Sequence, residues 1–393
     1  MKPDAQSVRR MREGFLGLGD CRLSDLRRLC ERETVMSDWP HAAAVEKNVL
    51  LYDCDAIRRR SGDAETRREI MAEWREAFAT GPGVIVLKRA EPDHAMLERA
   101  TALFFDLIAA QQRAGTGGGD HFAKPGANDR IWNSLQKHCL RDPANFAAYY
   151  ANEMLAMASG SWLGPGYQVT AQVNCVNPGG AAQSPHRDYH LGFRTAQEMA
   201  HYPRHVHALS PVLTLQGAIA HGDAPLAAGP TLFLPYSQRY EPGYLAAGLP
   251  DFVEYFAARH VQLPLETGDM VFFNPALIHA AGANVTRDVR RLVNLFQVSS
   301  AFGRAMESID RVAMCRALYP VLRRSTMTAS GIGNAIAACA DGYSFPTDLD
   351  RDPPLGGLAP KTQAALMREA LAGDWDDERF FAALERQAVA RLA

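Results

Sequence analysis

The sequence predicts a mainly β domain, in which an antiparallel core is flanked by helices from both ends of the chain. Two observations support this fold class. Between residues 168 and 302, short apolar segments are separated by turns rich in glycine, proline and aspartate, and helical periodicity is scarce. On both sides of this region, apolar residues recur every three or four positions, which is typical of amphipathic helices. The 393 residues are enough to bury one large core of this kind.

The N-terminal part begins with a charged, weakly periodic stretch at 1–48, which we expect to form outer helices or a partly disordered lead-in. Ile70, Trp74 and Phe78 then recur every four residues, which predicts a helix. A glycine-rich segment at 114–130 lacks phosphate-loop spacing and is expected to be a flexible surface loop. The elements expected before the β region are strands at 50–57 and 83–90 and helices at 64–81, 95–114 and 145–159.

The remaining elements follow from the same patterns. The β region is expected to hold strands at 168–177, 212–222, 229–236, 260–266, 269–280 and 290–302. Helical patterns return at 308–324, 361–373 and 376–393. We therefore expect a lead-in at 1–48, a domain at 49–303 that includes its N-terminal bracing helices, and a C-terminal helical extension at 304–393 packed on the same domain.

Composition excludes several classes of function. The formal net charge is −2, from 42 basic and 44 acidic residues, so the chain as a whole has no attraction for nucleic acid or anionic membranes. The seven cysteines are scattered, which favours free thiols over a disulfide framework or a zinc site. No apolar run reaches the roughly 18 residues of a spanning helix, and the N-terminus lacks the apolar stretch of a secretory signal. We expect a cytoplasmic protein without nucleic-acid or membrane partners, and its oligomeric state stays open.

The stretch SPHRDYHLGF, at 184–193, places His186 and Asp188 two residues apart. At the end of a strand, residues at this spacing point to the same side and can bind one metal ion. An H-x-D triplet alone is more often a polar surface loop, so the assignment depends on a third ligand. His279, at the end of the strand at 269–280, is the best candidate, because His190 would be poorly aimed. Two histidines and one carboxylate are the ligand set of non-haem Fe(II) oxygenases.

An arginine strengthens the assignment of an iron site. Arg290 follows His279 by eleven residues. If the chain turns near 282–287, the next strand runs back and can aim Arg290 into the same cavity, whereas its neighbour Arg291 would face the opposite side. A buried guanidinium requires an anion and matches a carboxylate in bidentate geometry. An iron face with open positions and an arginine at the end of its cavity describes a site for 2-oxoglutarate.

These motifs resemble the phytanoyl-CoA dioxygenase family of Fe(II)/2-oxoglutarate-dependent oxygenases. The similarity covers about residues 165–300 and is carried by PHRD, by GPTLFLP at 229–235, and by LETGDMVFFNPALIHAAGANVTRDVRR at 265–291. It implies a double-stranded β-helix, or jelly roll, braced by N- and C-terminal helices. It also implies His186, Asp188 and His279 as iron ligands, Arg290 as the 2-oxoglutarate anchor, and O2 as a reactant.

Further residues follow from this resemblance. The strand before H-x-D lends polar side chains to the co-substrate in this family, which makes Gln172 the first candidate here and Asn174 the second; the alternative is that they only pair with backbone. Ala281 stands where relatives often have a serine, so one hydrogen bond to 2-oxoglutarate is absent or supplied elsewhere. Because Asp188 is a carboxylate, hydroxylation of a C–H bond, with release of succinate and CO2, is favoured over chlorination. No protein nucleophile is needed beyond the metal centre.

The substrate side is less well defined by the sequence. Four residues are expected at the pocket mouth, and a glycine-rich loop is expected to act as a lid there. The charges of Lys124, Arg130 and Arg194, with a protonated His190, favour a small acidic substrate; the alternative is ordinary solvated loop residues. A jelly-roll metalloenzyme of another class, an isomerase or hydrolase that does not use O2, is the first competing hypothesis, and a non-catalytic binding module is the second. The four mouth residues are Lys124, Trp132, His190 and Arg194.

Overall fold

The computed structural model describes residues 14–115 and 126–392. Contacts between residues group the chain into two compact units. Among the described residues, the first unit comprises 14–90, 126–129 and 175–293, and the second unit comprises 91–115, 130–174 and 294–392. The chain passes from one unit to the other inside three of its strands, β4, β5 and β11, whose bounds are Asn128–Ile131, Gln168–Val176 and Arg291–Ser299.

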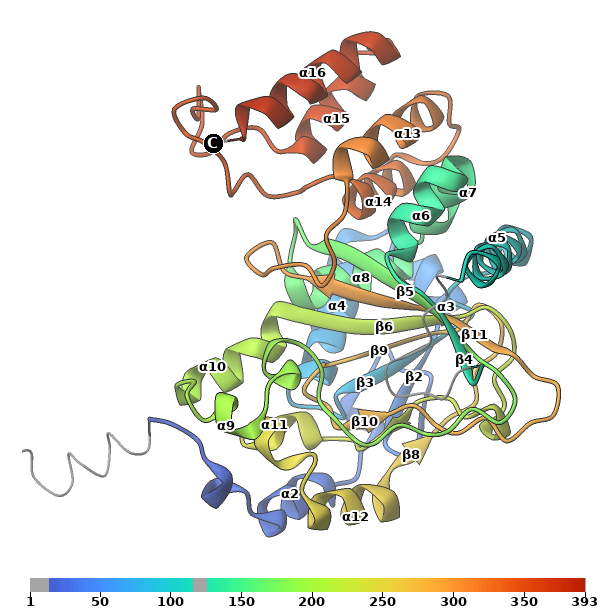
Figure 1. Ribbon diagram of the computed structural model, residues 1–393, viewed down its shortest axis with the longest axis vertical. Helices are drawn as coiled ribbons and strands as arrows, with labels where there is room; N and C mark the ends of the chain where they lie inside the picture. The colour runs from blue at the N-terminus through green and yellow to red at the C-terminus, as the bar shows by residue number, and fades with distance from the viewer. Residues whose placement is uncertain (1–13, 116–125, 393) are drawn as a thin grey trace, which may run out of the picture. The chain divides into compact units, whose positions relative to one another are not determined.

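The main sheet of the first unit has a buried, apolar centre. Strand β9 lies between β3 and β6 and is antiparallel to both, so that Phe273 has Val84 opposite it on one side and Gln216 on the other (Figure 1). Gly217 of β6 leaves room for the ring of Phe272, which an added Cβ would meet at 2.4 Å. The strand order is β1 (Ala44–Glu46), β2 (Val49–Asp53), β3 (Val84–Lys88), β9 (Met270–Phe273) and β6 (Thr214–Ala220), and only β2 and β3 are parallel.

A second, small sheet packs against the main one. It consists of β10 (His279–Ala280), β7 (Leu232–Phe233) and β8 (Val261–Gln262), in that order. Ring contacts join the two sheets: the centroids of Phe233 and Phe273 lie 5.1 Å apart, and those of Phe273 and His279 lie 4.8 Å apart. Two β layers with aromatic side chains between them confirm the predicted β core with flanking helices. The helices of this unit are α2 (Leu23–Cys30), α3 (Cys54–Arg60), α4 (Ala64–Ala79), α9 (Ala196–Met199), α10 (Arg204–Leu209), α11 (Gly243–Ala246) and α12 (Pro250–Arg259).

The second unit is mainly helical. Its centre contains His138, whose ring packs edge-on against Phe104, Phe146 and Tyr149. Burial lowers the pKa of His138 from its usual value of 6.5 to about 4. The helices are α5 (His94–Arg113), α6 (Ser134–Arg141), α7 (Pro143–Tyr150), α8 (Glu153–Leu163), α13 (Arg311–Arg323), α14 (Ala329–Cys339), α15 (Gln363–Ala372) and α16 (Asp377–Ala390).

The strand expected at 269–280 is two strands, β9 and β10, which belong to different sheets. Two other expected elements were wrong in detail, and in both cases a capping side chain is the reason. The strand expected at 50–57 ends at Asp53, whose carboxylate accepts hydrogen bonds from the amides of Asp55 and Ala56 and starts α3. The helix expected at 145–159 is two helices, because Asn152 accepts from the amide of Leu155 and starts α8. All seven cysteines are free, as predicted. Among the described residues, no helix combines the length and apolarity needed to cross a membrane.

Candidate metal centre

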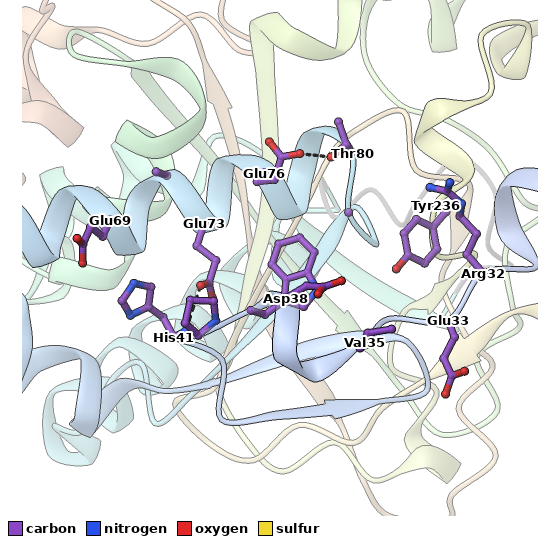
Figure 2. A pocket seen from close by; sticks show the side chains of 14 residues that line it. Arg32, Glu33, Val35, Asp38, His41, Glu69, Glu73, Glu76, Thr80 and Tyr236 are labelled. Carbon is purple, nitrogen blue, oxygen red and sulfur yellow. Dashed lines mark hydrogen bonds between the residues drawn. The ribbon is translucent and has the colours of Figure 1, made fainter.

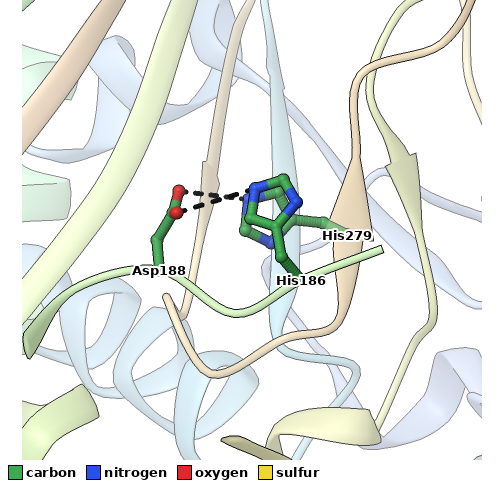
Figure 3. Close-up of side chains that lie close together, drawn as sticks. All are labelled: His186, Asp188 and His279. Carbon is green, nitrogen blue, oxygen red and sulfur yellow. Dashed lines mark ion pairs between the residues drawn. The ribbon is translucent and has the colours of Figure 1, made fainter. Parts of the chain in front are cut away.

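Three side chains of the first unit converge as the sequence predicted: His186, Asp188 and His279 (Figure 3). One ligand atom from each lies within 4.8 Å of the other two. Asp188 spans the pair, with Oδ1 at 3.6 Å from Nε2 of His186 and Oδ2 at 3.4 Å from Nε2 of His279. Two imidazole nitrogens and one carboxylate facing a common point form the ligand set of a non-haem iron site.

Backbone hydrogen bonds hold the ligand segments together. His186 and His279 each donate an amide hydrogen to the other's carbonyl, at 3.0 and 3.1 Å, and form an antiparallel bridge. The amide of Asp188 donates to the carbonyl of Pro275 at 3.1 Å. Since side chains alternate along an extended segment, this bridge turns His186 and Asp188 toward His279.

Hydrogen bonds also prepare the ligand atoms. The Nδ1 atoms of His186 and His279 lie 2.8 Å from the carbonyls of Ser184 and Leu277, which assigns the proton to Nδ1 and leaves each Nε2 able to bind metal. Gln216 Nε2 donates to Oδ2 of Asp188. Burial alone would raise the pKa of Asp188, but His279, His186 and Gln216 together hold the pKa well below its ordinary value, so the group is a carboxylate.

The two adjacent arginines lie in different surroundings. The side chain of Arg290 is 45% exposed, pairs with Asp129 at 3.6 Å, and donates from Nε to Asn177 Oδ1 at 3.2 Å. Arg291 is only 7% exposed, and within the described part of the chain its Nε and Nη1 are buried without a hydrogen-bond partner. Burial lowers the pKa of Arg291 to about 10. Burying a guanidinium without an anion is costly.

Strand pairing shows which arginine faces the metal centre. The amide of His221 donates to the carbonyl of Leu292 at 3.1 Å, so these residues lie opposite each other and share one face. Side chains alternate along a strand. Gln216 is five residues before His221 and therefore lies on the other face, and so does Arg291, which is next to Leu292. Gln216 contacts Asp188 on that face. The side chain on the metal side is thus Arg291, and Arg290 points away, contrary to the expected register.

The polar pair predicted on β5 lies in the second unit. Gln172 accepts from Arg130 Nη1 at 3.0 Å and donates to Gln297 Oε1 at 3.2 Å. Asn174 is buried, and its Oδ1 has no partner among the described residues. Both side chains are therefore inside the protein and polar, as expected of ligand-facing groups, and their role toward 2-oxoglutarate stays a prediction.

The described residues among those expected at the substrate mouth have different surroundings. His190 is half-buried and lies 3.0 Å from Ser210 Oγ through Nδ1. Arg194 is at the surface, 3.6 Å from Glu198. Trp132 belongs to the second unit, and the guanidinium of Arg130 lies over its ring, 4.9 Å from the ring centroid. Lys124 and most of the expected lid lie outside the described residues.

A cavity of about 980 Å³ in the first unit has none of the three metal ligands in its wall (Figure 2). Five acidic residues line it, but the most buried of them, Glu73, already accepts hydrogen bonds from the Tyr52 hydroxyl and the His41 amide. The cavity therefore adds nothing to the metal centre. The acids are Glu33, Asp38, Glu69, Glu73 and Glu76.

Comparison with known proteins agrees with the metal centre. The sequence profile of the family described as phytanoyl-CoA dioxygenase matches residues 58–292. No curated protein matches the sequence.

Solved structures similar to the chain include the non-heme α-ketoglutarate-dependent epimerase SnoN from nogalamycin biosynthesis (18% identity, 61% of this chain and 85% of that one, TM-score 0.40). The carbocyclase SnoK from the same biosynthesis is similar at 18% identity (56% and 80%, TM-score 0.41), and AviO1 from Streptomyces viridochromogenes Tue57 at 20% (60% and 97%, TM-score 0.42).

Proposed function

Because the chain belongs to the phytanoyl-CoA dioxygenase family, we propose that it is an Fe(II)- and 2-oxoglutarate-dependent dioxygenase that hydroxylates a C–H bond of a small molecule. The observation that supports this most directly is the convergence of His186, Asp188 and His279. Their atoms are one carboxylate oxygen and two imidazole nitrogens with Nδ1 protonated, a donor set that suits Fe(II) and leaves coordination positions free for 2-oxoglutarate and O2.

When bound, Fe(II) would activate O2 with electrons from 2-oxoglutarate, which leaves as succinate and CO2 while one oxygen atom enters the substrate. The protein supplies geometry and charge. His186, His279 and Asp188 hold the ion, and Gln216 fixes the carboxylate of Asp188. The rings of Phe233 and Phe273 lie beside His279 and keep water from that side of the site.

We assign the 2-oxoglutarate carboxylate to Arg291 in place of Arg290. Arg291 is buried, and two of its nitrogens have no hydrogen-bond partner among the described residues. It also lies on the same face of the sheet as Gln216, which supports this assignment. The fork geometry of guanidinium matches a carboxylate. Gln172 and Asn174 remain proposed co-substrate contacts. An acidic group on the substrate is likewise proposed, from the positive charges of Lys124 and Arg194.

The test is spectroscopic and catalytic. Under anaerobic conditions, Fe(II) and 2-oxoglutarate together should give a visible charge-transfer band. His186→Ala and Asp188→Ala should abolish this band, while circular dichroism shows that both variants are still folded. With O2, a screen of small molecules should find one that increases succinate formation and gains one oxygen atom by mass. A wild-type protein without the band, or turnover that needs no O2, would exclude the proposed function.

A further inference from the structure

The residue between the two clustered metal ligands, Arg187, points away from the metal. Side chains alternate along this segment, so His186 and Asp188 face His279 while Arg187 enters the protein on the opposite side. Arg187 is only 4% exposed. Burial lowers the pKa of its guanidinium to about 10. A cation in this position therefore has to be stabilised by the groups that surround it.

Those groups belong to a single segment, residues 237–244, which we call the clamp segment. Nη2 of Arg187 donates to the carbonyl of Ser237 at 2.5 Å and to the carbonyl of Tyr240 at 2.8 Å. The guanidinium also lies 5.3 Å from the ring centroid of Tyr244, a cation–π distance. Among the described residues no carboxylate pairs with Arg187, so its hydrogen bonds go to backbone carbonyls.

The fit around Arg187 is tight. A Cβ added to Gly243 would meet the Arg187 guanidinium carbon at 1.9 Å, and one added to Gly192 would meet the Arg187 carbonyl oxygen at 2.1 Å. Gly243 has an ordinary helical conformation, so its lack of a side chain serves this contact and not a backbone turn. The Arg187 guanidinium therefore fills the space that a side chain at position 243 of the clamp segment would need.

The clamp segment also holds the third metal ligand. The hydroxyl of Ser237 accepts a hydrogen bond from the amide of Ile278 at 2.8 Å, and Ile278 is the residue before His279. Ser237 thus bonds to Arg187 through its carbonyl and to Ile278 through its side chain. In addition, the Tyr244 hydroxyl donates to the carbonyl of Asp188 at 3.2 Å. The clamp segment thus contacts the Arg187 side chain between His186 and Asp188, the carbonyl of Asp188 and the amide next to His279.

We propose that Arg187 is a positioning residue, which joins the His186–Asp188 segment to the clamp segment so that all three ligands reach one metal ion together. The proposal rests on the metal centre of the proposed function. Residues that orient metal ligands from behind typically contribute about 10- to 100-fold to metal affinity. Because Arg187 is itself a cation, a purely electrostatic role would have the opposite sign: removal of the charge would strengthen metal binding.

The experiment measures Mn(II) binding by electron paramagnetic resonance, which needs no turnover. Arg187→Met is expected to weaken Mn(II) binding about 10- to 100-fold, and Arg187→Lys, which keeps a donor, to recover part of the loss. The control is Arg58→Met, since Arg58 Nη2 also donates to two carbonyls, those of Arg89 and Ala90, but no metal ligand is involved. It should lower the melting temperature while leaving Mn(II) affinity unchanged.

A double-mutant cycle isolates the contact. Gly243→Ala should weaken Mn(II) binding when Arg187 is present and have little further effect when Arg187 is Met, because the two residues then no longer meet. Additive losses, unchanged Mn(II) affinity in folded Arg187→Met, or tighter binding would each overturn the proposal. If wild type binds Mn(II) but shows no 2-oxoglutarate chemistry, the proposed function fails and the Arg187 role stands. A wild type that does not bind Mn(II) would overturn both.

Discussion

Replacing Arg291 and Arg290 separately by Gln tests which arginine binds 2-oxoglutarate. Arg291 is 7% exposed and has two nitrogens without partners, whereas Arg290 is 45% exposed in its side chain and pairs with Asp129. A hydrogen bond to a charged group contributes roughly 1.5–3 kcal/mol. Since about 1.4 kcal/mol is a factor of ten, Arg291→Gln should weaken 2-oxoglutarate binding about 10- to 150-fold. Arg290→Gln should change it less than about twofold.

The assay is an anaerobic titration of Fe(II)-loaded protein with 2-oxoglutarate, followed by the charge-transfer band, with thermal unfolding as a second readout. At a concentration 100 times its Kd, the co-substrate should stabilise wild type by about 2.7 kcal/mol, and a variant weakened about 30-fold by about 0.9 kcal/mol. Without ligand, Arg291→Gln should not be less stable than wild type, because it removes a buried, unpaired charge. The opposite ranking of the two variants would refute the strand register on which this reasoning is based.

Two further predictions concern the second unit and the substrate. The pKa of His138 is about 4 in the folded protein and about 6.5 in the unfolded chain, so between these pH values the unfolded chain binds a proton that the folded protein does not. The free energy of unfolding should therefore fall by about 3 kcal/mol as the pH drops from 6.5 to 4. Urea unfolding at several pH values measures this change, and a His138→Gln variant with the same pH dependence as wild type would contradict the prediction. If the substrate is acidic, Arg194→Ala should raise the substrate KM severalfold and leave the 2-oxoglutarate KM unchanged. Equal substrate KM values for variant and wild type would mean that Arg194 pairs only with Glu198 and does not bind the substrate.

Two of the three metal ligands could be predicted from sequence because their geometry is local. A spacing of two residues orients His186 and Asp188 alike in any extended segment, and His279 lies near the end of a clearly apolar stretch, at 269–280. The arginine could not be fixed to one position in the same way. The pair at 290 and 291 guarantees that one side chain faces each way, but which one faces the metal depends on the pairing of His221 with Leu292, more than seventy residues apart in the chain.

The positioning contacts were missed for a related reason. Arg187 is visible in the sequence between two ligands, yet its partners are backbone carbonyls of Ser237 and Tyr240, and carbonyls carry no sequence signal. Gln216 did have a signal, as a polar residue inside the otherwise apolar stretch LTLQGAIA. The helix break at Asn152 shows the limit of periodicity, since one capping side chain ends a pattern that continues through the break.

The second unit is built from three separate stretches of the chain, and this determines when the unit can fold during synthesis. Its helices α6 and α7 pack against α13 and α14, and Asn334 of α14 donates to the carbonyl of Ala151 at 3.1 Å. About 150 residues separate α8 from α13, which a ribosome takes roughly 7–30 s to add. During that interval the faces of α6 and α7 that pack on α13 and α14 lack these partners, so the second unit completes its core only after the C-terminal stretch has been made, and removing that stretch would leave those faces uncovered.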